Sequence, residues 1–423
     1  MRVTHASERP ARPSDELHVV FLVRSFGFPN GLANTNRVRL LGRALVEQGA
    51  TVHVLCTRVS ELPGRVRNTA ARGTADGISF EYTTGTTVRS ASFAARRLRE
   101  ARGYGGAIRR LVALRRRRRL DCVYLWSGAR SWRIAPWLLV KLLNTLRVPV
   151  IVELNEHPWR APRLPAVLGT RLSLLHGVSG AVAISAYLAA WASREAKDAR
   201  RGPLPILEVP ILVDAGEQHP TEYNAASEHL IYAASPGYDA ALAFILETMG
   251  SVWRRHPNCK LVVTGGTRAP SSTSDSGNSS SPGADPRIEY VGYVARDTYL
   301  QLLAQARAAL IPLFADQRSE ARFPTKIGEY LAAARPVVTT HVGELDRYLE
   351  DGETAYLSKP GDAAAYAAQI VAALDDPERA ATIGQAGRRI AEEQLHYALH
   401  GARLRAFFAA VARDTRAGSG DVR

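Results

Sequence analysis

The sequence predicts an α/β protein built from two doubly wound units. Strand-like apolar segments alternate with helical patterns in two successive sets along the 423 residues, as parallel sheets covered by helices require. A chain of this length can form two domains, each with its own core. The contents of 46% hydrophobic and 22% charged residues are typical of a soluble globular protein.

The first unit is predicted to be a Rossmann-like domain over residues 17–212. Its first strand, at residues 17–23, is followed by a glycine-containing loop and a helix over about residues 34–48. Ser185 is expected to cap the helix that begins after the last of these strands. Residues 206–214 are expected to link the two units. The later strands of this unit are predicted at residues 50–56, 122–126, 148–154 and 180–184.

The second unit is predicted over residues 213–395, followed by a helix at 396–413 and a tail at 414–423. The Ser, Pro and Gly content of residues 269–286 predicts a disordered insertion. The polar residues 1–16 are also expected to be disordered. The strands of the second unit are predicted at residues 230–234, 260–264, 288–291, 309–312 and 336–340.

Composition predicts a cytoplasmic protein. The three cysteines lack the spacing of a metal site or a disulfide framework. The N-terminus has no signal-peptide core, and no apolar run approaches the 18 residues of a membrane span.

The net charge of +15 is concentrated in one segment, residues 96–119, where eleven arginines and one acid give +10. Ile108, Leu111 and Leu114 occur there at helical spacing, which is consistent with a basic helix on an anionic membrane surface. A solvated face and a nucleic-acid-binding segment are the alternatives.

The most informative motif lies at residues 322–340. Pro324 suits a first helical turn, whose free N–H groups bind anions, and Lys326 adds a charge beside Thr325 and Arg322. Glu329 is one helical turn further on, where its carboxylate can accept hydrogen bonds from two vicinal hydroxyls. A diphosphate site beside a diol site predicts a nucleotide. The alternative is an ordinary amphipathic helix that leads into a buried strand.

This motif resembles the donor-binding signature of family-4 retaining glycosyltransferases of the GT-B fold. The resemblance is carried by residues 324–326, 329–332 and 336–338. It implies that Glu329 binds the nucleotide ribose and that the turn before it faces the diphosphate. It also implies that the last helix returns to the first domain and that no cofactor or bound metal is required.

Two segments of the first unit follow predicted strands, at the edge where doubly wound sheets bind ligands. Gly31, Asn34 and Arg37 lie in a loop that resembles the family's acceptor and phosphate loop; a plain turn is the alternative. Glu156 and His157 follow the strand at residues 148–154. The resemblance assigns His157, with Glu156 beside it, a catalytic role near the transferred sugar, whereas a helix cap with a surface histidine is the alternative.

The sequence departs from the family pattern at three positions. Tyr238 occupies the position of a diphosphate-binding lysine, and either Arg318, Arg322 or Lys326 is expected to supply the missing charge. Glu320 is one residue out of register with the family's first glutamate, and Ala334 replaces a helix-ending glycine, which predicts another cap geometry or a left-handed residue. The remaining predicted donor-site residues follow strands of the second unit, at Ser235, Gly237 and Gly265.

We therefore expect a GT-B retaining glycosyltransferase that moves a sugar from a nucleotide-diphosphate sugar to a sugar or lipid-linked acceptor, in cell-envelope glycan, polysaccharide or glycolipid synthesis. A GT-B protein that binds nucleotide-sugar without catalysis is one alternative. An arginine-rich nucleic-acid-binding protein is the other, although the sequence contains no recognised nucleic-acid-binding motif.

Overall fold

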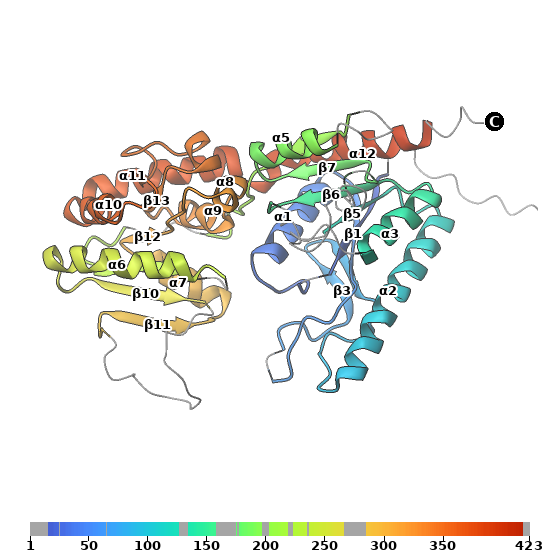
Figure 1. Cartoon of the computed structure of the whole chain (residues 1–423), viewed down its shortest axis with the longest axis horizontal. Coiled ribbons are helices and arrows are strands. Elements are labelled where there is room, and N and C mark those ends of the chain that lie inside the picture. The colour runs from blue at the N-terminus through green and yellow to red at the C-terminus, as the bar shows by residue number, and fades with distance from the viewer. Residues whose placement is uncertain are drawn as a thin grey trace, which may run out of the picture.

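The computed structural model describes residues 16–24, 26–64, 66–126, 134–157, 175, 177–196, 203–218, 223–234, 237–265 and 285–417. Two α/β domains lie next to each other, each built on one mainly parallel sheet (Figure 1). Most of the predicted insertion, nearly all of the predicted N-terminal segment and the last six residues lie outside the described residues.

The first domain contains an eight-stranded sheet in the order β3-β4-β2-β1-β5-β6-β7-β8, parallel except for the β3–β4 pair. Strands β3 and β4 were not predicted, because β3 is a largely exposed edge strand and β4 alternates buried with half-buried residues, so neither has a continuous apolar run. Its strands are β1 His18–Val23, β2 Thr51–Cys56, β3 Arg72–Ala75, β4 Ile78–Tyr82, β5 Cys122–Leu125, β6 Val150–Leu154, β7 Gly180–Ala183 and β8 Ile206–Glu208. Its helices are α1 Ala33–Glu47, α2 Phe93–Arg116, α3 Ile134–Thr145 and α5 Ala186–Glu195.

The second domain contains a six-stranded parallel sheet in the order β11-β10-β9-β12-β13-β14. Its strands are β9 His229–Ala233, β10 Lys260–Thr264, β11 Ile288–Gly292, β12 Ala308–Leu310, β13 Val337–Thr340 and β14 Tyr356–Ser358. Its helices are α6 Asp239–Arg255, α7 Arg296–Gln305, α8 Gln317–Ala321, α9 Thr325–Ala332, the 3-10 helix η2 Gly343–Arg347, α10 Ala363–Asp375 and α11 Pro377–Ile390.

Both sheets have a topological switch point, where consecutive strands leave the centre in opposite directions. This point lies between β1 and β5 in the first sheet and between β9 and β12 in the second. Open α/β sheets bind ligands at the carboxyl ends of the strands that flank such a point. The central strands are buried, so the ends of these strands are held rigidly.

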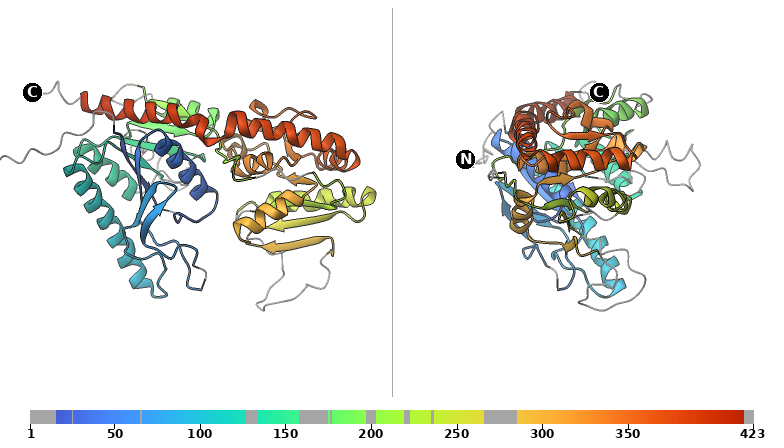
Figure 2. Two further views of the ribbon diagram at one scale, coloured as in Figure 1. Left: turned by 180° about the vertical axis from the view of Figure 1, so that it is seen from behind. Right: turned by 90° about the vertical axis from the view of Figure 1, so that its left-hand side faces the viewer.

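The chain crosses between the domains twice. Near residue 213 it enters the second domain, and it returns through η3 Ala391–Leu395, η4 Tyr397–His400 and α12 Gly401–Ala417. The two crossings are joined by hydrogen bonds from Val213 N to Leu395 O and from Tyr397 N to Val213 O, at 3.0 and 3.1 Å. Phe408 of α12 packs against Phe21 and Tyr124 of the first domain, over which Figure 2 shows this helix. The helix extends to Ala417, beyond the predicted end at residue 413.

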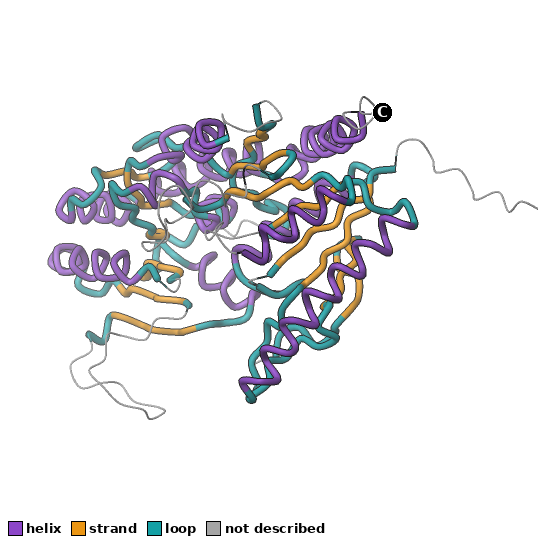
Figure 3. Tube along the Cα trace, turned by 45° about the vertical axis from the view of Figure 1, so that its right-hand side comes forward, coloured by secondary structure: helices purple, strands orange, loops and turns teal. Residues whose placement is uncertain are grey.

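Helix α2 contains the arginine-rich segment up to Arg116 and lies alongside the first sheet (Figure 3). Leu111 is buried, and Ile108 and Leu114 pack against the same core cluster. These three residues therefore face the protein core and do not form a lipid-facing surface. The prediction that they are the membrane-facing side of a basic helix was wrong. The spacing of a helix gives its apolar face but not the partner of that face. No helix among the described residues is both long and apolar enough to cross a membrane.

Candidate functional site

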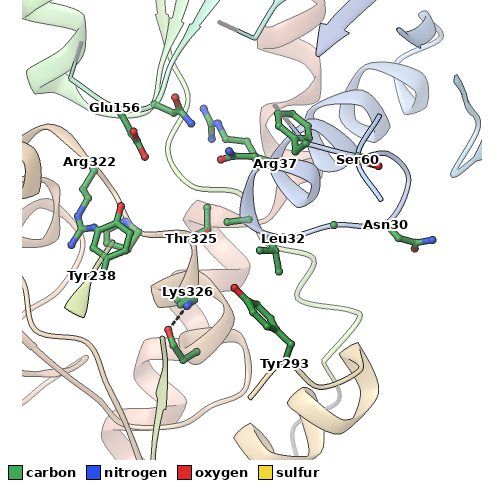
Figure 4. Close-up of a pocket in the computed structure, with 18 of the residues that line it drawn as sticks. Asn30, Leu32, Arg37, Ser60, Glu156, Tyr238, Tyr293, Arg322, Thr325 and Lys326 are labelled. Carbon is green, nitrogen blue, oxygen red and sulfur yellow. Dashed lines mark hydrogen bonds between the residues drawn. The ribbon is translucent and has the colours of Figure 1, made fainter. Parts of the chain in front are cut away.

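A cavity of about 660 Å³ lies between the two domains, at the carboxyl ends of both sheets. The first domain contributes the loops after β1, β2 and β6 to its wall, and the second contributes the ends of β9 and β12 and the start of α9 (Figure 4). Of the predicted site residues, the cavity is lined by Gly31, Asn34, Arg37, Glu156, Tyr238, Arg322, Thr325 and Lys326.

The start of α9 forms the cationic floor of this cavity. Pro324 is the extended residue before the helix, and Thr325 and Lys326 form its first turn, so the free amides of that turn point toward the cavity. Lys326 Nζ donates to the carbonyl oxygens of Ala233 and Ala234, where β9 ends. Burial lowers the pKa of Lys326 to about 8, although the Glu329 carboxylate acts in the opposite direction.

Arg322 and Tyr238 form the neighbouring wall, where Figure 4 shows them side by side. The Arg322 Cζ atom lies 4.3 Å from the centroid of the Tyr238 ring, and the Arg318 Cζ atom lies 4.1 Å from the same centroid. Arg318 also donates to Gly237 O at 3.1 Å. Within the described residues, the buried Nε of Arg322 has no hydrogen-bond acceptor. Burial lowers the pKa of Arg322, as does the nearby Arg318 charge.

Glu329 lies one turn below Lys326 and does not line the cavity. Its carboxylate accepts hydrogen bonds from Arg296 Nη1 at 2.6 Å and from the Tyr299 hydroxyl at 3.0 Å. Arg296 also pairs with Glu217 at 3.0 Å. The carboxylate predicted to hold the ribose is thus held in place by two residues of α7, and it shares Arg296 with a second acid.

The two predicted catalytic residues differ in their surroundings. Glu156 faces the cavity, as Figure 4 shows. His157 does not line it, and its ring instead lies against those of Tyr187 and Trp191 on α5. Its Nε2 atom is 3.4 Å from Nε2 of Gln317, so it contacts α8 of the second domain.

Arg37 is buried at the edge of the cavity and holds the first domain together. Its Nε donates to Glu153 at 2.5 Å, and its two Nη atoms donate to the carbonyls of Pro210 and Val209 at 2.6 and 3.0 Å. The side chains of Arg37 and Glu153 are each only 1% exposed. Arg37 was predicted to belong to a phosphate-binding loop. In the structure it forms a buried ion pair with Glu153, and its hydrogen bonds join α1, β6 and the segment after β8.

The two other predicted residues of this loop line the cavity. A Cβ at Gly31 would overlap the Thr35 side chain, whose hydroxyl donates to Gly27 O at 2.8 Å. This close approach explains the glycine at position 31. Asn34 is exposed on the cavity side of α1.

The other predicted donor residues shape the strand ends. Gly265 has a φ of 96°, and a Cβ there would overlap the carbonyl oxygen of Ala234. Gly237 also has a positive φ, of 82°. Ser235 lies outside the described residues. Glu320 is on α8 and does not line the cavity.

Tyr293 was not predicted from the sequence, although it lines the cavity. Its side chain is 45% exposed, and the Arg67 Cζ atom of the first domain lies 5.7 Å from its ring centroid. The available signal was an aromatic residue directly after the β11 glycine, at the carboxyl edge of the second sheet. Ala334 has a φ of 53°, so α9 ends in a left-handed residue without glycine, as one of the two predicted geometries required.

The second domain, whose strand ends help to form the cavity, contains a region that matches a known protein family. Residues 228–376 match the family described as "Glycosyl transferases group 1". This second domain is a glycosyltransferase domain. The matched region includes Tyr238, Arg322, Lys326 and Glu329. A comparison with curated proteins gave no match.

Solved structures similar to the whole chain are GT-B glycosyltransferases, which confirms the predicted fold. Sucrose-phosphate synthase from Thermosynechococcus elongatus superposes with a TM-score of 0.65 at 15% identity, covering 95% of this chain and 100% of that chain. Anabaena HepE in complex with UDP-glucose gives 0.63 at 12% identity, covering 93% and 100%. WaaG, a glycosyltransferase involved in lipopolysaccharide biosynthesis, gives 0.58 at 12% identity, covering 92% and 99%.

The glycosyltransferase domain is joined to the first domain beside the cavity. Ser185 caps α5 by accepting from Leu188 N at 3.2 Å, as predicted, and its hydroxyl donates to Ala321 O at 2.7 Å. Ala186 N, in the first turn of α5, donates to Glu344 of the second domain at 2.6 Å. These bonds hold the two cavity walls in a defined orientation.

Proposed function

We propose that this protein is a retaining glycosyltransferase that moves a sugar from a nucleotide-diphosphate sugar to an acceptor hydroxyl. The carrying observation is the cationic floor of the interdomain cavity. Arg322, Lys326 and the first turn of α9 gather there at the switch point of the glycosyltransferase domain. Two cations beside free helix amides are suited to a diphosphate.

The proposed reaction needs stabilisation of charge on the departing diphosphate. The bond between the sugar C1 and the β-phosphate oxygen breaks, and the electron pair stays on the diphosphate. The acceptor hydroxyl attacks C1 from the same face, and its proton passes to a diphosphate oxygen. Arg322, Lys326 and the α9 amides would stabilise the developing negative charge, and no bound metal is assigned to this step.

The first domain is proposed to hold the acceptor. Glu156 lines the cavity, where its carboxylate can orient a sugar hydroxyl and support positive charge at C1. Glu329 would bind the ribose through the lone pairs that Arg296 and Tyr299 leave open.

A uridine diphosphate sugar is the first donor to test, because HepE was solved with UDP-glucose. The similarity to WaaG, which is involved in lipopolysaccharide biosynthesis, favours a role in cell-envelope glycan or glycolipid synthesis. An acceptor of that kind would also fit peripheral binding at the inner face of the membrane through the exposed arginines 116–119.

The test is an assay of UDP-sugars against a panel of sugar and glycolipid acceptors. Release of UDP together with a product of unchanged anomeric configuration, read by NMR, is the expected result. Lys326→Met is the matched inactive variant, since it removes the ammonium while keeping an apolar side chain of similar length. An inverted product would overturn the retaining mechanism.

Non-catalytic nucleotide-sugar binding is the second candidate function. Tyr238 at the expected lysine position and Glu320 away from the cavity wall favour it. Binding of UDP-sugars without hydrolysis or transfer to any acceptor would support this candidate. Strong binding to nucleic acid, with a steep dependence on salt, would instead favour the third candidate from the sequence.

A further inference from the structure

A second, smaller cavity of about 120 Å³ lies in the first domain, outside the interdomain site. Four arginines contribute to its wall, namely Arg58, Arg89, Arg96 and Arg99, and the one acid in the wall is Glu100. The lining therefore carries a net charge of +3. Arg96, Arg99 and Glu100 lie near the N-terminal end of α2. In Figure 1 this end of the helix lies at the far side of the first domain from α12.

Close packing of α2 fixes the position of the arginines on that helix. A Cβ at Gly103 would overlap the Thr57 carbonyl oxygen, and Thr83 Oγ1 donates to Gly103 O at 2.7 Å. The helix therefore lies directly on the chain that follows β2 and β4. Arg96 and Arg99 are one turn apart, so they project from the same side of the helix.

The adjacent loops place the other two arginines opposite α2. Glu61 and Val88 form a bridge, which holds the loop after β2 beside the loop after β4. Arg58 comes from the first of these loops and Arg89 from the second. Two loops and one helix thus converge on a single small volume.

Internal contacts use only part of this positive charge. Arg58 pairs with Glu100, and Arg99 donates to Val88 O at 3.1 Å. In the described part of the chain, Arg89 and Arg96 have no carboxylate within ion-pair distance. Four guanidinium groups around one acid repel one another, so binding of an anion there lowers the electrostatic energy.

The arginine cavity adjoins the interdomain site, because Val59 lines both. Its volume suits one phosphate group rather than a nucleotide sugar. A guanidinium group presents paired donors that match phosphate oxygens.

We propose that the arginine cavity binds a phosphate group carried by the acceptor, while the hydroxyl to be glycosylated enters the interdomain cavity. This inference rests on the proposed transferase function. The phosphate can belong to a lipid headgroup or to a soluble phosphorylated glycan, and both present the same chemistry to the four arginines.

The direct test is binding of glycerol 3-phosphate, with glycerol as the uncharged control. The wild type should bind glycerol 3-phosphate, and the double variant Arg89→Gln with Arg96→Gln should bind it at least about tenfold more weakly. A matched double variant, Arg102→Gln with Arg109→Gln, removes the same charge at exposed positions of α2 that do not line the cavity, and should bind as the wild type does.

Vesicles distinguish the two sources of phosphate. Retention on phosphatidylglycerol vesicles that is lost only in the Arg89/Arg96 variant supports a lipid headgroup. Binding of glycerol 3-phosphate without any difference between phosphatidylglycerol and phosphatidylcholine vesicles supports a soluble phosphorylated acceptor. Absence of glycerol 3-phosphate binding in the wild type, or equal losses in the two double variants, would overturn the proposal.

UDP binding by the same variants separates this proposal from the proposed function. The Arg89/Arg96 variant should bind UDP with unchanged affinity, because its substitutions lie outside the interdomain cavity. A wild type that binds glycerol 3-phosphate but no UDP-sugar would contradict the transferase function while leaving the phosphate site in place.

Discussion

The Arg322 guanidinium lies against the ring of Tyr238, with 4.3 Å between Cζ and the ring centroid. Tyr238 occupies the position where the family resemblance predicts a diphosphate-binding lysine. An aromatic ring attracts a cation through its quadrupole and thereby holds it in place. We infer that Tyr238 supplies the missing charge indirectly, by positioning Arg322 at the cavity wall.

Replacement of Arg322 by Gln should therefore weaken UDP binding about tenfold or more, because one charge-assisted contact to the diphosphate is lost. Binding of uridine, which has no phosphate, should change little. Isothermal titration of both ligands checks this. Arg318→Gln is the matched control, since Arg318 contacts the same ring but does not line the cavity. Equal losses in the two variants would place the charge requirement elsewhere.

The local parts of the donor site could be predicted from the sequence, because their signals are local. Pro324, Lys326 and Ala334 mark the start, the charge and the end of one short helix. The sequence left open whether Arg318, Arg322 or Lys326 supplies the charge that Tyr238 lacks, because the cations that approach Tyr238 are decided only when β9 and the α8–α9 segment are brought together. Similarly, the Arg37 contacts join segments more than 100 residues apart.

The packing partner of the apolar face of α2 also could not be predicted from the sequence. Helical spacing identified Ile108, Leu111 and Leu114 correctly as one face. A core and a membrane both bury such a face, so the sequence could not choose between them. The fold makes this choice, because the face packs against the first sheet.

The affinity for UDP should fall as pH rises above about 8. The pKa of Lys326, lowered by burial, is about 8 in the free protein. A bound diphosphate favours the charged ammonium, so binding above this pH requires uptake of a proton, at a cost of up to about tenfold in affinity per pH unit. Titrations between pH 6.5 and 9.5 measure this. Lys326→Met should bind more weakly with a flatter profile; an equal slope in the variant would assign the titration to another group.

Glu329→Ala should weaken UDP binding by about 1.5–3 kcal/mol for each hydrogen bond lost to the ribose. It should leave the affinity for a 2′,3′-dideoxy analogue of UDP unchanged, because that ligand lacks the two hydroxyls. Glu217→Ala is the control, since it removes the other acid that pairs with Arg296. An equal effect of Glu329→Ala on both ligands would show that the residue only positions α7.

His157→Ala should lower turnover by more than it lowers UDP affinity, because His157 belongs to the first domain, which is proposed to hold the acceptor. The contact between His157 and Gln317 allows a test of whether His157 acts on the sugar or acts by holding the two domains together. Gln317→Ala breaks the same contact from the opposite domain. If Gln317→Ala reproduces the loss of turnover, His157 acts by holding the domains together. If activity falls only in His157→Ala and in Glu156→Gln, both residues act on the sugar.

Arg37→Met should lower the free energy of unfolding by about 3–5 kcal/mol, because it leaves the buried carboxylate of Glu153 without its cation. The carbonyls of Val209 and Pro210 would lose their donors as well. Urea denaturation followed by circular dichroism measures the change. Asn34→Ala, in the same predicted loop but exposed, should alter stability by no more than about 0.5 kcal/mol. A stable Arg37→Met variant with impaired transfer would restore Arg37 to the acceptor site, whereas the expected loss of stability assigns it to the domain core.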